Sequence, residues 1–177
     1  METKELKNGQ IMTIREAMKE DASDIISYLN EVAGETDYLS FGQGEFAFSA
    51  AEEEKYIEEG AENSGSVMLL CFIDGELASV SQLIGHTKKR ELHTSELAIS
   101  IREKFWGLGI GSINMEALIK YAKNSERLKL IYLEAISENK RAINLYKKFG
   151  FIEAGEIPAL MQVDGRYFDV TMMYLVI

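Results

Sequence analysis

The sequence contains few cysteines, histidines and basic residues, and each shortage excludes a kind of site or partner. Cys71 is the one cysteine among 177 residues, so an internal disulfide is excluded. His86 and His93 are the two histidines. Without a cysteine partner they do not make a metal site, and we expect both at exposed strand ends. Lysine and arginine total 19 against 29 aspartates and glutamates, and the net charge of −10 argues against nucleic acid and membrane as partners. This acidic balance suits a cationic substrate, or it serves solubility alone.

Long apolar segments and targeting signals are missing as well. No apolar run approaches the roughly 18 residues that a membrane-spanning helix needs, and no signal peptide pattern is present. A cytoplasmic location is therefore expected by default. The length suits a single domain over residues 1–177 with its own core, in which the polar residues 1–9 are expected to form a disordered leader. Cys71 lies in the apolar run VMLLCFI, which favours a buried core residue over a nucleophile.

Hydrophobic periodicity and turn residues divide the chain into strands and helices. An Asp-Gly pair separates two apolar runs at Asp74-Gly75 and again at Asp164-Gly165, which predicts two hairpins. Asp21 or Ser23 can cap a first helix that ends at Gly34. The other expected elements are strands at residues 11–16, 67–73, 76–85 and 128–135, and an acidic helix at residues 49–62.

A glycine cluster at residues 107–111 follows an apolar, β-branched run and precedes a segment with helical periodicity. Leu92, Ile99 and Ile101 belong to the run, which predicts a strand. The helical positions are Ile110, Ile113, Ala117, Leu118, Tyr121 and Ala122. A strand, a glycine loop and a helix in this order bring backbone N–H groups and the positive end of a helix dipole to one point. This arrangement favours a phosphate or pyrophosphate, which a side chain in place of glycine would keep away from the backbone.

The spacing of the glycines narrows the kind of phosphate site. A dinucleotide-binding fingerprint needs Gly-x-Gly-x-x-Gly, and a Walker loop needs a lysine beside its last glycine; neither pattern is present around Gly111. A plain turn is the third interpretation. The run FWGLGIG resembles motif A of the GNAT superfamily, the acyl-CoA-dependent N-acyltransferases, which is written Arg/Gln-x-x-Gly-x-Gly/Ala. Gly109 and Gly111 match that motif, whereas Trp106 stands at the Arg/Gln position.

A second motif lies downstream, in the run SENKRAINLYKKFGF. It resembles GNAT motif B, Asn-x-x-Ala-x-x-Leu-Tyr-x-x-x-Gly-Phe, and matches at Asn139, Ala142, Leu145, Tyr146, Gly150 and Phe151. Asn139 is expected to cap a helix that Gly150 ends. Near the C-terminus, the pattern at Asp164, Gly165, Tyr167, Asp169 and Met173 resembles the branch that holds ribosomal-protein alanine and spermidine acetyltransferases.

The resemblance implies a fold and a chemistry. The implied fold is a single α/β domain with a mixed, mostly antiparallel sheet flanked by helices on both faces. The implied activity is an acetyl-CoA-dependent N-acetyltransferase that works by direct attack of the amine, without a metal. Tyr146 would protonate the departing thiolate as general acid, and Glu96 is the candidate base. A water chain as the base, or a Glu96 that merely faces solvent, are the alternatives.

The resemblance also implies which residues hold acetyl-CoA. The strand end at residues 99–101 would pair with the pantetheine amides, and the backbone amides of residues 107–112 would hold the pyrophosphate. The implied cofactor-binding residues are Ile99, Ser100, Ile101, Trp106, Gly107, Leu108, Gly109, Ile110, Gly111, Ser112, Asn139, Asn144 and Tyr146.

The acceptor and two rival functions are open at this stage. The rivals are a non-catalytic acyl-CoA-binding regulatory domain and a structural α/β domain without a cofactor. The acceptor could be a polyamine, another small amine or amino acid, an antibiotic, or a protein N-terminus. Residues 35–49 are either an irregular connection with aromatics in the core or a loop that borders the acceptor. The segment contains three carboxylates, which favour a cationic small amine as the acceptor: Glu35, Asp37 and Glu45. A homodimer through the last strands is also expected, because members of the superfamily are often dimers.

Overall fold

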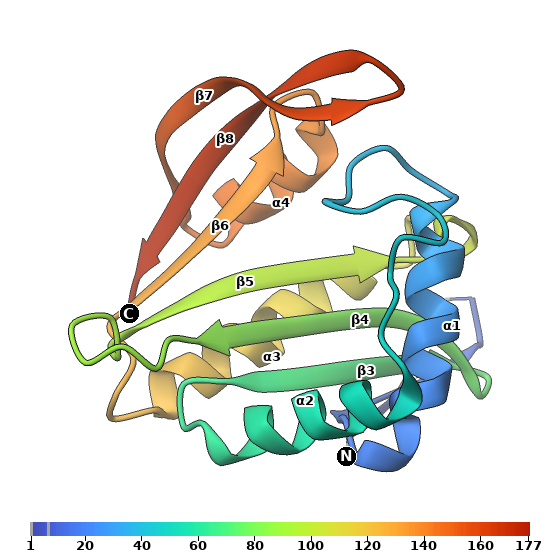
Figure 1. Ribbon diagram of the computed structural model, residues 1–177. Coiled ribbons are helices and arrows are strands. Elements are labelled where there is room, and N and C mark those ends of the chain that lie inside the picture. The colour runs from blue at the N-terminus through green and yellow to red at the C-terminus, as the bar shows by residue number, and fades with distance from the viewer. Residues whose placement is uncertain (1, 7) are drawn as a thin grey trace.

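Within residues 2–6 and 8–177, which the computed structural model describes, eight strands form one mixed sheet with four α-helices packed on it (Figure 1). The strand order is β1-β2-β3-β4-β5-β6-β8-β7. Neighbouring strands are antiparallel except β5 and β6, which are parallel. The strands are β1 (Glu2–Glu5), β2 (Ile11–Glu16), β3 (Val67–Ile73), β4 (Glu76–Gly85), β5 (Thr94–Ile101), β6 (Leu130–Ile136), β7 (Ile152–Val163) and β8 (Arg166–Val176). The helices are α1 (Ala22–Ala33), α2 (Ala50–Glu62), α3 (Ile110–Asn124) and α4 (Lys140–Lys148), with short 3-10 turns η1 (Lys19–Asp21) and η2 (Glu103–Phe105). The expected α/β fold with a mostly antiparallel sheet is confirmed.

The expected disordered leader at residues 1–9 contains a strand in its described part, and residues 1 and 7 lie outside the described residues. Glu2–Glu5 forms β1, which pairs with β2 in antiparallel register from Glu2↔Ile14 to Glu5↔Ile11. Leu6 follows the strand and is only 7% exposed, in an apolar cluster that includes Met12. The prediction failed because an edge strand is held by backbone hydrogen bonds to its neighbour. The polar composition of this segment gives no sign of such pairing.

The helices cover both faces of the sheet. α3 and α4 pack on one face through Met115, Leu118 and Ile143, against strand residues such as Leu97 and Leu133. α1 and α2 cover the opposite face, where Ile25, Tyr28 and Ile57 contact Leu70 and Val80. Neighbouring strand residues thus point to opposite faces, as the period of two requires. Cys71 is 1% exposed, which confirms the prediction of a core cysteine.

The parallel pair β5 and β6 is short. Only three residue pairs join the strands, from Thr94↔Leu130 to Glu96↔Tyr132. Beyond Glu96 the two strands diverge, as Figure 1 shows between the labels β5 and β6. β5 stays paired with β4 as far as Ile101 on its other side. One edge of β5 therefore runs unpaired into the space between the two halves of the sheet.

Candidate active site

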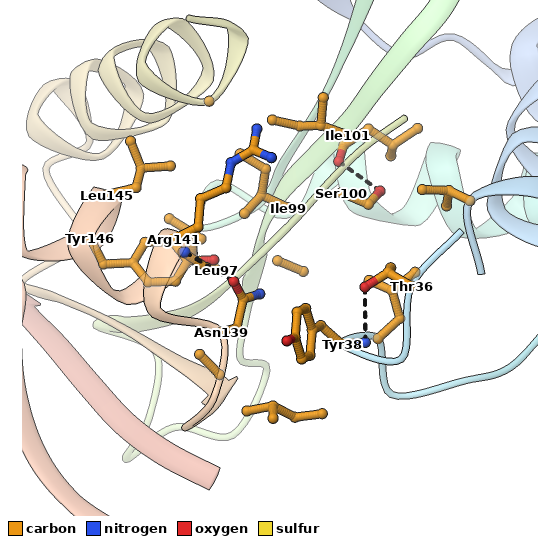
Figure 2. A pocket seen from close by; sticks show the side chains of 18 of the residues that line it. Thr36, Tyr38, Leu97, Ile99, Ser100, Ile101, Asn139, Arg141, Leu145 and Tyr146 are labelled. Atoms are coloured by element: carbon orange, nitrogen blue, oxygen red, sulfur yellow. Dashed lines mark hydrogen bonds between the residues drawn. The ribbon is translucent and has the colours of Figure 1, made fainter. Parts of the chain in front are cut away.

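A pocket of about 670 Å³ lies where β5 and β6 diverge (Figure 2). Its walls are the C-terminal part of β5, the glycine loop with the start of α3, the helix α4, and the loop between α1 and α2. The predicted site residues in its lining are Glu96, Ile99, Ser100, Ile101, Trp106, Gly107, Gly109, Ile110, Gly111, Ser112, Asn139, Asn144 and Tyr146. Leu108 does not line the pocket, because its side chain packs against a cluster with Phe105 and Ile110.

The glycines of the loop serve two different purposes. Gly107 and Gly109 have φ angles of 82° and 86°, in the left-handed region that side chains rarely adopt. A Cβ built on either would meet nothing within 4 Å, so both backbones border open space. Gly109 is the N-cap of α3, so the free N–H groups of the first turn of α3 lie next to this open space. Gly111 instead permits close packing, since its Cβ would lie 2.9 Å from Leu145 Cδ2. The loop can thus offer backbone amides to an anion.

Trp106 and Arg141 form a pair at the edge of this loop. The indole Nε1–H donates to the carbonyl oxygen of Ile101 at 2.8 Å, which ties the loop to the end of β5. The guanidinium carbon of Arg141 lies 4.3 Å from the centre of the indole ring, a cation–π geometry. No carboxylate within residues 2–6 and 8–177 is recorded as its ion-pair partner. Partial burial lowers the pKa of Arg141 from its usual 12.5, yet guanidinium stays charged. Sequence reasoning missed Arg141; its signal was Trp106 at a position where the motif carries a polar side chain.

α4 and its N-cap bring three uncharged polar side chains to the pocket beside the cationic Arg141 and Lys148. Tyr146 is 6% exposed, and burial raises the pKa of its phenol to about 12, so the hydroxyl keeps its proton at neutral pH. Asn139 accepts a hydrogen bond from the Ala142 N–H at 3.1 Å and caps the helix, as expected. Its amide nitrogen is still available as a donor. Asn144 is exposed and lines the pocket one turn further along.

Glu96 is connected to the surface through two aromatic residues. Its Oε2 lies 3.5 Å from the hydroxyl of Tyr132, the outer limit of a hydrogen bond. That hydroxyl is 2.9 Å from Nε2 of His86, and the two rings stack at 5.8 Å. Burial, followed by the charge of Glu96, raises the pKa of Tyr132. The prediction of an exposed strand-end residue is wrong for His86, because Tyr132 covers it from a strand 46 residues away; His93 is exposed as expected.

The loop between α1 and α2 faces the pocket with its apolar side chains. Thr36, Tyr38, Leu39, Ser40, Phe41 and Phe46 belong to the lining. Of its carboxylates, Glu35 accepts from Arg102 Nε and from the Glu103 N–H, both at 2.6 Å. Glu45 accepts from the Gly42 N–H at 2.7 Å. The loop is therefore part of the pocket wall. Of the three carboxylates that suggested a cationic acceptor, Glu35 and Glu45 are hydrogen-bonded elsewhere, and Asp37 is exposed and does not line the pocket.

Two further features are absent from the described part of the chain. No group of three or more His, Cys, Asp or Glu side chains there could hold a metal ion. No helix among these residues is long and apolar enough to cross a membrane.

Comparison with known proteins identifies the family. The model of the acetyltransferase (GNAT) family matches residues 32–151. An N-alpha-acetyltransferase of Sulfurisphaera tokodaii is 31% identical over 155 residues, which are 86% of this chain and 87% of that protein. The crystal structure of an acetyltransferase of the GNAT family from Streptococcus pneumoniae superposes with a TM-score of 0.91 at 30% identity, covering 94% of this chain and 99% of the other. The structure of yncA from Salmonella typhimurium with its cofactor acetyl-CoA shares the fold, with a TM-score of 0.81 at 21% identity over 93% of each chain. The family model covers the glycine loop, β6 and α4 together, and the chain belongs to the GNAT family of acetyl-CoA-dependent acetyltransferases.

Proposed function

We propose that the protein transfers the acetyl group of acetyl-CoA to a primary amine by direct attack, with Tyr146 as general acid and Glu96 as general base. One observation carries the proposal. The glycine loop, the free edge of β5, Tyr146 and Glu96 all line one pocket at the divergence of β5 and β6. Each part serves a different portion of the reaction.

The cofactor end of the pocket suits a diphosphate ester with an amide-containing arm. The open backbone at Gly107 and Gly109 and the N-terminus of α3 suit the pyrophosphate. Arg141 adds a positive charge at the same end, and Trp106 keeps its guanidinium plane oriented. β6 leaves the edge of β5 beyond Glu96 unpaired, and this edge can accept the arm as an additional strand up to Ile101, whose carbonyl oxygen already accepts from Trp106.

Tyr146 is suited to protonate the leaving thiolate. When bound, the thioester supplies an activated acetyl group and a sulfur that leaves as a thiolate. A phenol whose pKa is raised to about 12 is fully protonated at neutral pH and can donate a hydrogen bond and then a proton to the sulfur. Burial at 6% exposure shields that proton from exchange with bulk water.

Glu96 is suited to deprotonate the acceptor. A free alkyl amine has a pKa near ~10.4 and must lose a proton before it can attack. Glu96 projects from the same sheet face as Gln82 and lines the pocket, so its carboxylate is available there. Tyr132 and His86, which do not line the pocket, lead from Glu96 towards the surface, a route by which the proton can leave.

The test is binding and turnover in one preparation. Acetyl-CoA is titrated by calorimetry, and thiol release is then followed with a panel of primary amines. Tyr146→Phe should lower kcat by about 100-fold, the lower end of general acid catalysis, with little change in acetyl-CoA affinity. Tyr167→Phe is the matched control, because Tyr167 is 64% exposed and away from the pocket.

Three outcomes decide between the candidate functions. Turnover that depends on Tyr146 supports the proposal. Acetyl-CoA binding without turnover on any amine favours a non-catalytic acyl-CoA-binding domain. Unchanged kcat in Tyr146→Phe removes the assigned acid role.

A further inference from the structure

Aromatic side chains of the loop between α1 and α2 line the acceptor half of the pocket. Phe41 and Phe46 line the pocket with ring centres 5.6 Å apart, and Phe48 continues the row 5.2 Å from Phe46. Phe48 in turn contacts Tyr56 of α2 edge-on at 6.4 Å. Tyr38 stands in the same half of the pocket, across from Asn139 in Figure 2. Tyr38, Phe41 and Phe46 thus form an aromatic wall beside the polar Thr36 and Ser40, and Phe48 and Tyr56 extend the aromatic row outside the lining.

Hydrogen bonds from α1 hold this wall in place. Asn30 donates through Nδ2 to the carbonyl of Phe46 at 3.1 Å and accepts from the Gly44 N–H at 3.1 Å. Glu35 ties the start of the loop to Arg102, directly after β5. A wall that is ordered before the ligand arrives needs little further ordering on binding, so apolar contact with it contributes directly to affinity.

The charges around the pocket are divided between its two ends. Arg141 and Lys148 are the cations in the lining, and both belong to α4 at the cofactor end. Lys148 Nζ lies 3.4 Å from Ser112 Oγ, and Arg141 stacks on Trp106. No lysine or arginine is recorded in the lining beside the aromatic wall, within the described part of the chain. A carboxylate on the acceptor would lose hydration there without gaining a cationic partner.

A second ammonium group on the acceptor is equally unsupported at the wall. Glu35 and Glu45 are engaged by Arg102 and by the Gly42 N–H, and Asp37 is exposed outside the lining. Glu96 is assigned to the reacting amine and so does not serve a second ammonium group. Glu134 lines the pocket from β6 but is exposed to solvent, so its attraction is screened.

We propose that the acceptor is a primary monoamine with an apolar body, such as an aromatic ring, and no carboxylate. The amine points to Glu96, and the apolar body packs on Tyr38, Phe41 and Phe46. This inference rests on the proposed acetyltransferase function and specifies its acceptor. It excludes polyamines and free amino acids as preferred substrates.

Two matched ligand pairs test the inference with the wild-type protein. L-Phenylalanine adds a carboxylate to 2-phenylethylamine, and 1,6-diaminohexane adds an ammonium group to hexylamine. In the thiol-release assay, kcat/KM should be at least about tenfold higher for the simpler member of each pair, because the added charge is desolvated without a partner. Equal or higher kcat/KM for either charged member would overturn the assignment.

Variants of the loop test the wall itself. Phe46→Ala should lower kcat/KM for 2-phenylethylamine by about tenfold, corresponding to the lost apolar contact, with unchanged KM for acetyl-CoA. Phe46→Leu keeps most of the apolar volume and should lose less. Asp37→Asn is the charge control and should leave every amine unchanged. A drop in diamine turnover in Asp37→Asn would instead restore a role for the loop carboxylates and contradict the inference.

Amine binding without turnover separates this inference from the proposed function. Each amine is titrated by calorimetry into protein saturated with CoA, which has no acetyl group to transfer. Tighter binding of 2-phenylethylamine and hexylamine than of their charged counterparts supports the inference even if no amine is acetylated. Tighter binding of the charged counterparts would contradict the inference, whatever the result of the acetyltransferase assay.

Discussion

Replacing Arg141 by alanine should weaken acetyl-CoA binding by about tenfold, entirely through the pyrophosphate. The guanidinium lies 4.3 Å from the indole of Trp106 beside the glycine loop, with no carboxylate partner recorded in residues 2–6 and 8–177. A unit charge about 4 Å from a phosphate at a protein surface attracts it by about 4 kcal/mol before desolvation. Since charge-assisted hydrogen bonds retain about 1.5–3 kcal/mol and the side chain is partly solvated, we expect about 1.4 kcal/mol, or tenfold.

Cofactor fragments that lack one or all phosphates test which phosphate group Arg141 contacts. Calorimetry on wild type and Arg141→Ala would use CoA, dephospho-CoA without the 3′-phosphate, and pantetheine without any phosphate. The loss should be equal for CoA and dephospho-CoA and should vanish for pantetheine. It should also shrink as salt is added, because the interaction is partly screened.

Matched variants separate charge from shape. Arg141→Lys keeps the charge but loses the planar stacking on Trp106, so an intermediate loss of about threefold is expected. Lys140→Ala removes the neighbouring exposed cation, which does not line the pocket, and should have no effect. A loss that persists with pantetheine would refute the reasoning by making Arg141 a structural residue. A loss that disappears with dephospho-CoA would assign it to the 3′-phosphate instead.

Two further predictions concern the glycine loop and the buried face of α2. Gly109→Val should abolish acetyl-CoA binding while the protein still folds, with about 1–3 kcal/mol lost in denaturant unfolding because valine is strained at a φ of 86°; calorimetry beside circular dichroism checks both, and retained binding would reduce the loop to a turn. Glu53 is 1% exposed with an unpaired Oε2, and burial raises its pKa from 4.5 to about 7. Because the folded protein binds the Glu53 proton more tightly than the unfolded chain, the protonated side chain contributes fully to folding stability below pH 4.5. This contribution is lost as pH rises through 7, where the buried carboxyl group must ionise. The full shift corresponds to about 3 kcal/mol, and solvent screening reduces the expectation to about 1–2 kcal/mol. Glu53→Gln should therefore be more stable than wild type at pH 8 but not at pH 4, whereas the exposed Glu54→Gln should match wild type at both; equal behaviour of the two variants would contradict the burial argument.

Local chemistry made much of the fold predictable. Asp74-Gly75 and Asp164-Gly165 form the expected hairpin turns, with positive φ at all four residues. Asn139 and Gly150 bound α4 as their cap preferences predict, and β3 and β4 have the expected bounds. These features depend on neighbours within a few residues, which a single sequence contains.

Contacts between distant segments were not predictable in the same way. Tyr132 of β6 reaches His86 past the intervening strand β5, and Arg141 of α4 reaches Trp106 of the glycine loop. The loop at residues 35–49 has no period, so its composition could not tell which side chains face inward; Glu35 turned to Arg102 and Phe46 to the pocket. Leu92 lies in the turn before β5 rather than in the strand, since pairing begins at Thr94.

The brief parallel contact between β5 and β6 has a mechanical consequence. Three residue pairs at one end are the only backbone ladder between the β1–β5 and β6–β8 halves of the described sheet, although the apolar core beneath α3 and α4 spans both. Within the described sheet, the backbones of the two halves are hydrogen-bonded to each other only at the start of β5, and a pantetheine arm along β5 would add backbone-like hydrogen bonds beyond Glu96. Amide hydrogens on that edge would then exchange slowly only while the cofactor is bound. Their protection would report occupancy directly.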